Sequence, residues 1–131
     1  MNQLSLLVVE SDAGVSRMFA DVFSDRSWKV DVCLDGESAY RAISSDRHYD
    51  VIVVSYQVPG SSGVQLTKLA RSLDHRSSTP VVMITGSGDI EREAFSAGVN
   101  EVWHKPMDLF AFIRAVEKYV GVATCHNREH A

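Results

Sequence analysis

The sequence has few cysteines, no long apolar run and no block of basic residues, and each absence argues against a class of protein. Among its 131 residues only Cys33 and Cys125 are cysteines. Two thiols give no disulfide framework, so we expect a reducing, cytoplasmic compartment. Apolar runs such as residues 6–9 and 51–54 fall far short of the roughly 20 residues that cross a bilayer. No basic residue precedes the first apolar run, so we expect neither a signal peptide nor a membrane partner.

The charge balance is mildly acidic, with 13 basic and 17 acidic side chains and a net charge of −4. Basic residues do not cluster, so direct binding to nucleic acid is not expected. A hydrophobic fraction of 45% and a charged fraction of 23% are ordinary for a globular protein. The length fits one domain, and no linker divides it. We expect a single domain over residues 1–121 and a disordered tail over 122–131.

Hydrophobic periodicity switches repeatedly between extended and helical along the chain. Segments with helical spacing of apolar residues alternate with short apolar segments, which predict strands over residues 4–9, 29–34, 51–54, 81–84 and 101–104. Such alternation predicts an α/β fold, a doubly wound five-stranded parallel sheet with five helices. Asp89 is the predicted N-cap of the fourth helix, Asp108 caps the fifth, and Gly121 ends it.

Polar residues follow the predicted strands at their carboxyl ends, where open α/β sheets bind ligands. They include the acids Glu10 and Asp12, the hydroxyls of Ser55 and Thr85, and Lys105. A lysine, a threonine hydroxyl and carboxylates at one end of a sheet indicate handling of a phosphoryl group. The lysine supplies a positive charge, the threonine a hydrogen bond, and the carboxylates can hold Mg²⁺.

At these residues the chain resembles the receiver domains of two-component response regulators. The resemblance covers about residues 4–120, and it rests on the order and spacing of residues 8–12, 49–55, 59–63, 82–86, 97–98 and 105–106. It implies a flavodoxin-like sheet with strand order 2-1-3-4-5, an order that a chemotaxis member of this family also has. It also implies a cis Lys105–Pro106 bond and signalling by phosphoryl transfer from a histidine kinase.

The chain departs from the family's pattern at the acceptor and at the metal site. By resemblance the phosphoryl pocket comprises Glu10, Ser11, Ser55, Thr85 and Lys105. Ser55 stands where the pattern has the phosphoryl-accepting aspartate, and Ser11 stands where it has an acidic metal ligand. Glu10 and Asp12 are therefore weak candidate ligands, and we expect Mg²⁺ binding to be weak or absent and no other cofactor. At the switch position, where the pattern has an aromatic residue, this sequence has Val102.

A serine hydroxyl is a poor nucleophile without a general base, whereas an aspartate is ionised at neutral pH. We therefore predict a degenerate receiver, not an enzyme, that signals by protein contact without phosphorylation. By resemblance its contact face comprises the fourth helix, fifth strand and fifth helix. Its expected partners are a histidine kinase, an output domain or, through the same face, a second copy. The candidate contact residues are Ile90, Glu93, Val102, His104 and Phe110.

Two alternatives stay open. A receiver of this kind could still be phosphorylated on a displaced acid, Asp12 or Asp50, although Asp50 lies at the opposite end of its predicted strand. Asp12 is better placed to cap the first helix. The second alternative is a flavodoxin-like protein that binds FMN or a nucleotide. The lack of a Ser/Thr-rich phosphate loop after the first predicted strand disfavours it.

Overall fold

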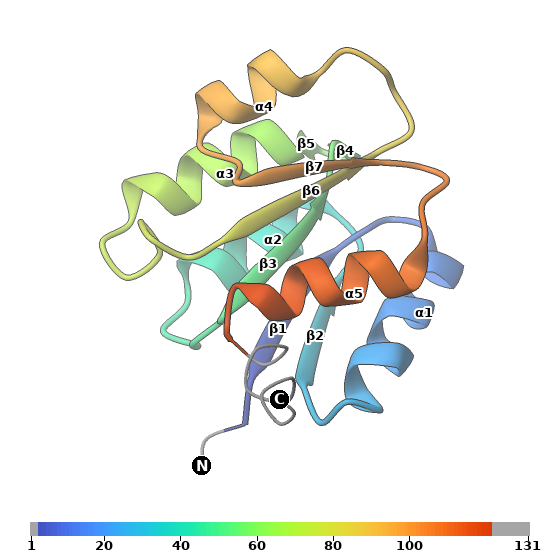
Figure 1. The fold of residues 1–131 in the computed structure, drawn as a ribbon. Coiled ribbons are helices and arrows are strands. Elements are labelled where there is room, and N and C mark those ends of the chain that lie inside the picture. The colour runs from blue at the N-terminus through green and yellow to red at the C-terminus, as the bar shows by residue number, and fades with distance from the viewer. Residues whose placement is uncertain (1–2, 122–131) are drawn as a thin grey trace.

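The computed structural model describes residues 3–121, which form one parallel five-stranded sheet with helices on both faces (Figure 1). The strand order is β2-β1-β3-β6-β7, which is the expected 2-1-3-4-5 once two short extra strands are set aside. The five strands are β1 (Ser5–Val9), β2 (Lys29–Cys33), β3 (Val51–Ser55), β6 (Val81–Thr85) and β7 (Glu101–His104). The predicted tail, residues 122–131, lies outside the described residues.

Five helices cover the sheet: α1 (Ala13–Ser24), α2 (Gly36–Ser44), α3 (Gly63–Ser72), α4 (Glu91–Ala97) and α5 (Leu109–Lys118). Helices α1 and α5 pack on one face, where Phe19 of α1 stacks against Phe112 of α5. Helices α2, α3 and α4 pack on the other face. Within residues 3–121 no helix is both long and apolar enough to cross a membrane.

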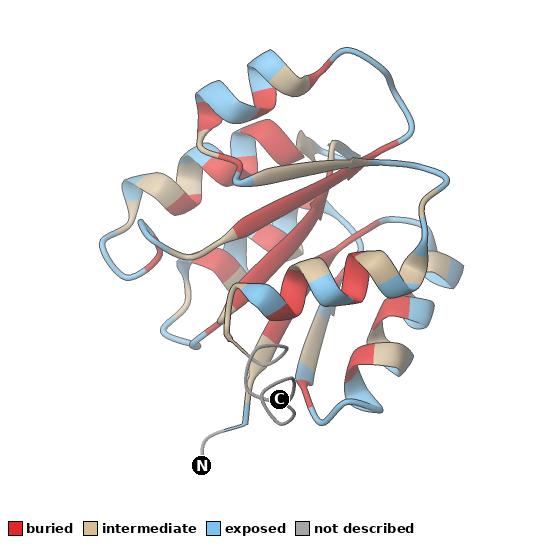
Figure 2. Ribbon diagram, viewed as in Figure 1, coloured by how far each residue is buried: buried red, intermediate tan, exposed pale blue. Residues whose placement is uncertain are grey.

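The central strands are buried on both sides because helices cover both faces of the sheet (Figure 2). Every residue of β3 and β6 is buried, and so are four of the five residues of β1. Val, Ile and Leu fill these strands without alternation, as expected for parallel strands packed on both faces. The edge strands β2 and β7 are only partly covered.

Side-chain caps begin four of the five helices and confirm most of the expected starts. Asp12 caps α1, Asp35 caps α2, Ser62 caps α3 and Asp108 caps α5. The expectation for Asp89 is wrong, since α4 begins after Ile90 and has no side-chain cap. Asp89 instead adopts a positive φ of 60° in the turn before it. The final helix ends at Lys118, three residues before Gly121.

A two-stranded hairpin that the sequence did not predict follows β3. Its strands are β4 (Gln57–Val58) and β5 (Ser61–Ser62), and they are joined through Gly60, which has a φ of 80°. The hairpin leads directly into Gly63, the first residue of α3. A Cβ atom at Gly63 would lie 2.5 Å from the carbonyl oxygen of Ser55, so the helix approaches the end of β3 as closely as it does because this residue is glycine.

Two polar side chains, Arg76 and Asp31, form hydrogen-bond networks away from the predicted pocket. Arg76 is 1% exposed and donates to the carbonyl oxygens of Ile43, Ala42 and Ser45 at the end of α2. On β2, Asp31 accepts hydrogen bonds at 2.6 Å from both Tyr49 and Arg47.

Candidate functional site

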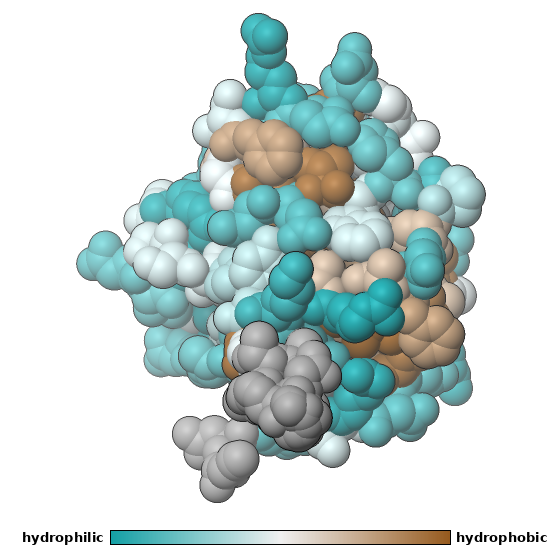
Figure 3. All heavy atoms as spheres, viewed as in Figure 1, coloured by the Kyte–Doolittle hydropathy of each residue, from teal (hydrophilic) through white to brown (hydrophobic). Residues whose placement is uncertain are grey.

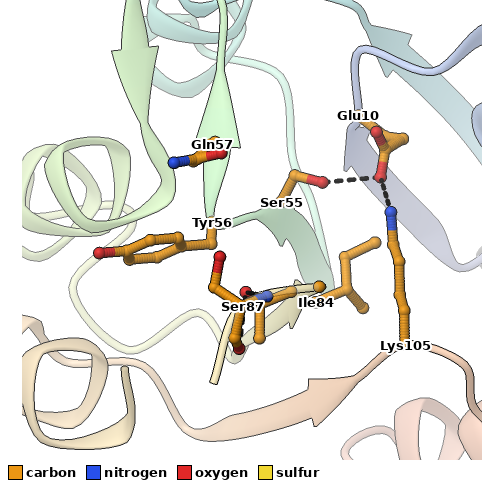
Figure 4. A pocket seen from close by; sticks show the side chains of 9 residues that line it. Glu10, Ser55, Tyr56, Gln57, Ile84, Ser87 and Lys105 are labelled. Carbon is orange, nitrogen blue, oxygen red and sulfur yellow. Dashed lines mark hydrogen bonds and ion pairs between the residues drawn. The ribbon is translucent and has the colours of Figure 1, made fainter. Parts of the chain in front are cut away.

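The structure brings four of the predicted pocket residues together at the carboxyl ends of the strands. Glu10 follows β1, Ser55 ends β3, Thr85 ends β6 and Lys105 follows β7. All four line one cavity of about 130 Å³, together with Tyr56, Gln57, Ile84, Gly86 and Ser87 (Figure 4). The Lys105–Pro106 bond is cis, as the resemblance implied.

The carboxylate of Glu10 is the hub of this cavity. Its Oε1 accepts a hydrogen bond from the Ser55 hydroxyl at 2.6 Å and another from Lys105 Nζ at 3.1 Å, as Figure 4 shows. Its Oε2 accepts from the backbone N–H of Asp12 at 3.0 Å. Glu10 is buried, whereas Lys105 is partly exposed. A buried carboxylate needs such partners, because an unpaired charge in the interior is costly.

Thr85 is buried, and its hydroxyl is engaged locally. Its Oγ1 accepts from the backbone N–H of Ser87 at 2.9 Å and lies 3.3 Å from the carbonyl oxygen of the same residue. The hydroxyl therefore holds the turn that follows β6, at the wall of the cavity.

Ser11 and Asp12 do not line the cavity. Ser11 is exposed, and Asp12 directs its Oδ1 to the N–H groups of Gly14 and Val15 at the start of α1. The carboxylate of Asp12 therefore serves as a helix cap. Asp50 lies at the opposite end of β3, where it accepts hydrogen bonds from the N–H of Ser5 and from His48.

The donor set of the cavity does not fit Mg²⁺. Of the described residues, Glu10 is the only acid that lines it, and both of its oxygens already accept hydrogen bonds, one of them from an ammonium group. Mg²⁺ binds through carboxylates and oxygen donors, and a lysine at the same oxygen competes with it. Within residues 3–121 no three His, Cys, Asp or Glu side chains form a group that could hold a metal.

Tyr56 links the cavity to α4, a role that the sequence analysis missed. The residue directly follows Ser55, and its hydroxyl donates to Glu93 of α4 at 2.7 Å. This hydrogen bond raises the pKa of the Tyr56 hydroxyl. The sequence did offer one indication of this role, namely that Tyr56 is a polar aromatic residue directly after the predicted site residue Ser55. The contact could not be read from the sequence, because 37 positions separate the two partners.

A second contact joins α4 to the last strand. His104 on β7 lies 2.6 Å from the carboxylate of Glu91, and this hydrogen bond lowers the pKa of Glu91. Helix α4 is thereby tied to the ends of two strands, to β3 through Tyr56 and to β7 through His104.

The expected contact face is exposed only in part. Phe110 is 69% exposed and Phe95 of α4 is 49% exposed, and Figure 3 shows apolar surface near α4 and near the start of α5. Glu93 and His104 are also exposed. Ile90 corrects the expectation, since its side chain is buried in the core beneath α4. Val102 is half-buried against the same core.

Comparison with known proteins gives the family. The family model of the response regulator receiver domain matches residues 6–117. The phosphate regulon transcriptional regulatory protein PhoB of Pseudomonas aeruginosa is 24% identical over 124 residues, 89% of this chain and 53% of that protein. The transcriptional regulatory protein TcrA of Mycobacterium tuberculosis is 30% identical over 118 residues, 86% of this chain and 46% of that protein. The chain thus spans about half the length of these relatives.

Among solved structures, the receiver domain of a sensor histidine kinase from Pseudomonas aeruginosa has a TM-score of 0.82 at 20% identity. The match covers 92% of this chain and 99% of that one. That structure holds a magnesium ion in its active-site cleft. At this identity the likeness establishes the fold, and it agrees with the match to the family model. The chain belongs to the response regulator receiver domain family of two-component signalling.

Proposed function

We propose that this receiver domain signals by protein contact and is not phosphorylated on an aspartate. The observation that carries the proposal is the network of Ser55, Glu10 and Lys105. Ser55 stands at the acceptor position by resemblance, and its hydroxyl donates a hydrogen bond to Glu10. Lys105, the cation that would hold a transferred phosphoryl group, is neutralised by the same carboxylate.

The chemistry of a phosphorylated serine is also disfavoured in this cavity. Ser55 is buried, and the group nearest its hydroxyl proton is the carboxylate of Glu10, whereas a serine nucleophile is usually activated by a histidine base. Phosphoryl transfer depends on metal and lysine charge at the transferring group. Neither charge is available to an incoming phosphate here.

The contact face in this proposal comprises α4, β7 and α5, with Phe110, Glu93 and His104 at the surface. Its partner is another signalling protein, a histidine kinase or an output domain. Exposed aromatic side chains such as Phe110 and Phe95 suit such a surface.

Intact mass after incubation with acetyl phosphate and Mg²⁺ tests the first part of the proposal. We expect no gain of a phosphoryl group, and a clean gain on any acid would contradict it. Phe110→Arg tests the face: proteins retained from native lysate by the wild type should be lost. Tyr40→Arg, an exposed aromatic position on α2, is the matched control and should retain them.

A further inference from the structure

We propose that two copies of this chain pair antiparallel through their β2 strands and so form one continuous ten-stranded sheet. The proposal goes beyond the proposed function, and it places the self-contact at the sheet edge opposite to β7. The face of α4, β7 and α5 then stays free for a different partner.

The backbone of β2 is open on one side. Within residues 3–121 β2 pairs with β1 alone. Lys29 N–H donates to the carbonyl of Leu4, and the Cys33 carbonyl accepts from Glu10 N–H, so residues 29 and 33 face β1. Peptide groups alternate along a parallel strand, so those of Val30 and Val32 point away from the sheet. Unpaired groups of this kind are a template for another strand.

The open edge carries exposed apolar side chains on one face. Val30 is partly buried and packs against the core on the α1 side of the sheet, and residues two apart along a strand share a face. Val32 is 40% exposed and Leu34, just beyond the strand, is 46% exposed. No proline or glycine interrupts residues 28–34, and the one acid among them, Asp31, is held by Tyr49 and Arg47. The edge therefore carries no proline, no glycine and no unpaired acid, and its one lysine, Lys29, lies at the first position of the strand.

The sequence of this edge is complementary to itself. A two-fold axis through Val32 places Val32 opposite Val32 and Val30 opposite Leu34. It also places Lys29 opposite Asp35, so two opposite-charge pairs flank the apolar centre. Lys29 and Asp35 are both exposed. In this register the outward-pointing peptide groups of Val30 and Val32 face their counterparts in the second copy, as a hydrogen-bonded antiparallel pair requires.

Other registers pair these residues less well. An axis through Val30 would place Trp28 opposite Val32 and leave Leu34 uncovered. Trp28 is buried and follows Ser27, which has a positive φ of 72°, so the strand does not extend in that direction. An axis through Leu34 would place Val32 opposite Gly36, where α2 begins. The axis through Val32 alone pairs all three apolar residues, and a two-fold axis gives a closed dimer.

Sedimentation over a range of protein concentrations tests the proposal. We expect the wild type to reach twice its 14.5 kDa monomer mass. Val32→Lys sets two ammonium groups opposite each other and should raise the dimer dissociation constant by about tenfold or more. Phe95→Lys is the matched control, because Phe95 is similarly exposed but lies on α4, and it should leave the dimer unchanged.

Disulfide trapping gives a second readout, which can capture even a weakly associating dimer covalently. In a Cys125→Ser background, Val32→Cys should cross-link to dimers under mild oxidation, because hydrogen-bonded antiparallel partners have Cα atoms about 5.5 Å apart. Phe95→Cys in the same background should not. A wild type that stays monomeric at millimolar concentration and a Val32→Cys that does not cross-link would overturn the proposal. A dimer lost in Phe95→Lys but kept in Val32→Lys would also overturn it. None of these results bears on phosphorylation, which the mass experiment decides separately.

Discussion

At position 55 a hydroxyl donates a hydrogen bond to Glu10, where a carboxylate would repel it. Two carboxylates at the 2.6 Å separation of Ser55 and Glu10 need a shared proton or a cation between them. Among residues 3–121, Lys105 is the cation that lines the cavity and can supply a charge there. With serine at position 55, the polar groups of Glu10, Ser55 and Lys105 are all hydrogen-bonded to one another, so a test of the proposed function begins at this residue.

Ser55→Asp should restore a nucleophile but leave the metal site one acid short. We expect slow labelling by acetyl phosphate with weak dependence on Mg²⁺. Ser11→Asp combined with Ser55→Asp should label about tenfold faster or more, since one good metal ligand is worth at least about 1.4 kcal/mol of barrier. The rate is followed by intact mass.

Ser5→Asp is a control for added charge, because Ser5 lies at the opposite end of β1 and should not change the labelling of the Ser55→Asp variant. If the single variant labels as fast as the double, Glu10 and Asp12 suffice for the metal. If neither labels, the cavity itself no longer has the geometry for transfer.

At the scale of elements, single polar side chains join segments that the sheet alone does not hold. Arg76 joins the loop before β6 to the end of α2, and its guanidinium also lies 4.8 Å from the ring centre of Tyr49. Burial lowers the pKa of Arg76, and its guanidinium donates to the backbone carbonyls of Ile43, Ala42 and Ser45. Backbone carbonyls at a helix C-terminus supply the compensating negative potential.

Arg76→Met should lower the free energy of unfolding by about 2–3 kcal/mol, because several buried carbonyl groups lose their donor. Denaturant unfolding measures the change. Arg92→Met is the matched control on α4, where Arg92 is exposed, and it should alter stability by less than about 0.5 kcal/mol. Equal losses in the two variants would mean that the guanidinium does not hold α2.

The contacts of Asp31 make the attachment of β2 dependent on pH. Burial raises the pKa of Asp31, but hydrogen bonds from Tyr49 and Arg47 outweigh it, and the net pKa lies below the ordinary value of 3.8. A lowered pKa means that the ionised form stabilises the fold above 3.8, and that this stability is lost as the pH falls through the lowered value.

Asp31→Asn should therefore cost about 1 kcal/mol near neutral pH, with a smaller difference from the wild type at each step below pH ~4. Urea unfolding at low protein concentration, across a series of pH values, measures that difference. A difference that stays constant down to pH ~2 would show that the charge of Asp31 contributes nothing.

For the whole molecule, the closed network in the cavity predicts indifference to divalent cations. A ligand at 100 times its dissociation constant adds about 2.7 kcal/mol to stability. We expect about 10 mM Mg²⁺ to shift the melting temperature by less than about 1 °C. The Ser11→Asp, Ser55→Asp double variant is the positive control and should gain several degrees. A comparable gain in the wild type would contradict the argument that Lys105 and Ser55 occupy the carboxylate.

The central strands of the sheet were predictable from the sequence because they are buried on both faces and read as unbroken apolar runs. The capping aspartates 12 and 108 were also predictable, since a cap acts within three residues of itself. The start of α4 was not, because Asp89 has the composition of a cap but adopts a turn conformation that the surrounding loop imposes.

Within the site, strand ends placed Glu10, Ser55, Thr85 and Lys105 correctly in one cavity. What the sequence could not supply was the set of contacts between distant residues. Periodicity says which side of an element faces inward, but it does not say that Tyr56 reaches Glu93. Periodicity also did not reveal that the side chain of Ile90 is buried in the core, because a single apolar residue before a helix can point either inward or to solvent.

The close approach of α3 to β3 means that the cavity can be altered from behind, without touching any residue that lines it. A methyl group on Gly63 would meet the carbonyl of Ser55 at 2.5 Å and the terminal carbon of Met83 at 2.8 Å. Helix or strand end would have to give way, and the displaced peptide is the one that carries the Ser55 hydroxyl toward Glu10. A substitution at position 63 is therefore expected to disturb the cavity indirectly, because one added carbon atom would displace the backbone that positions Ser55.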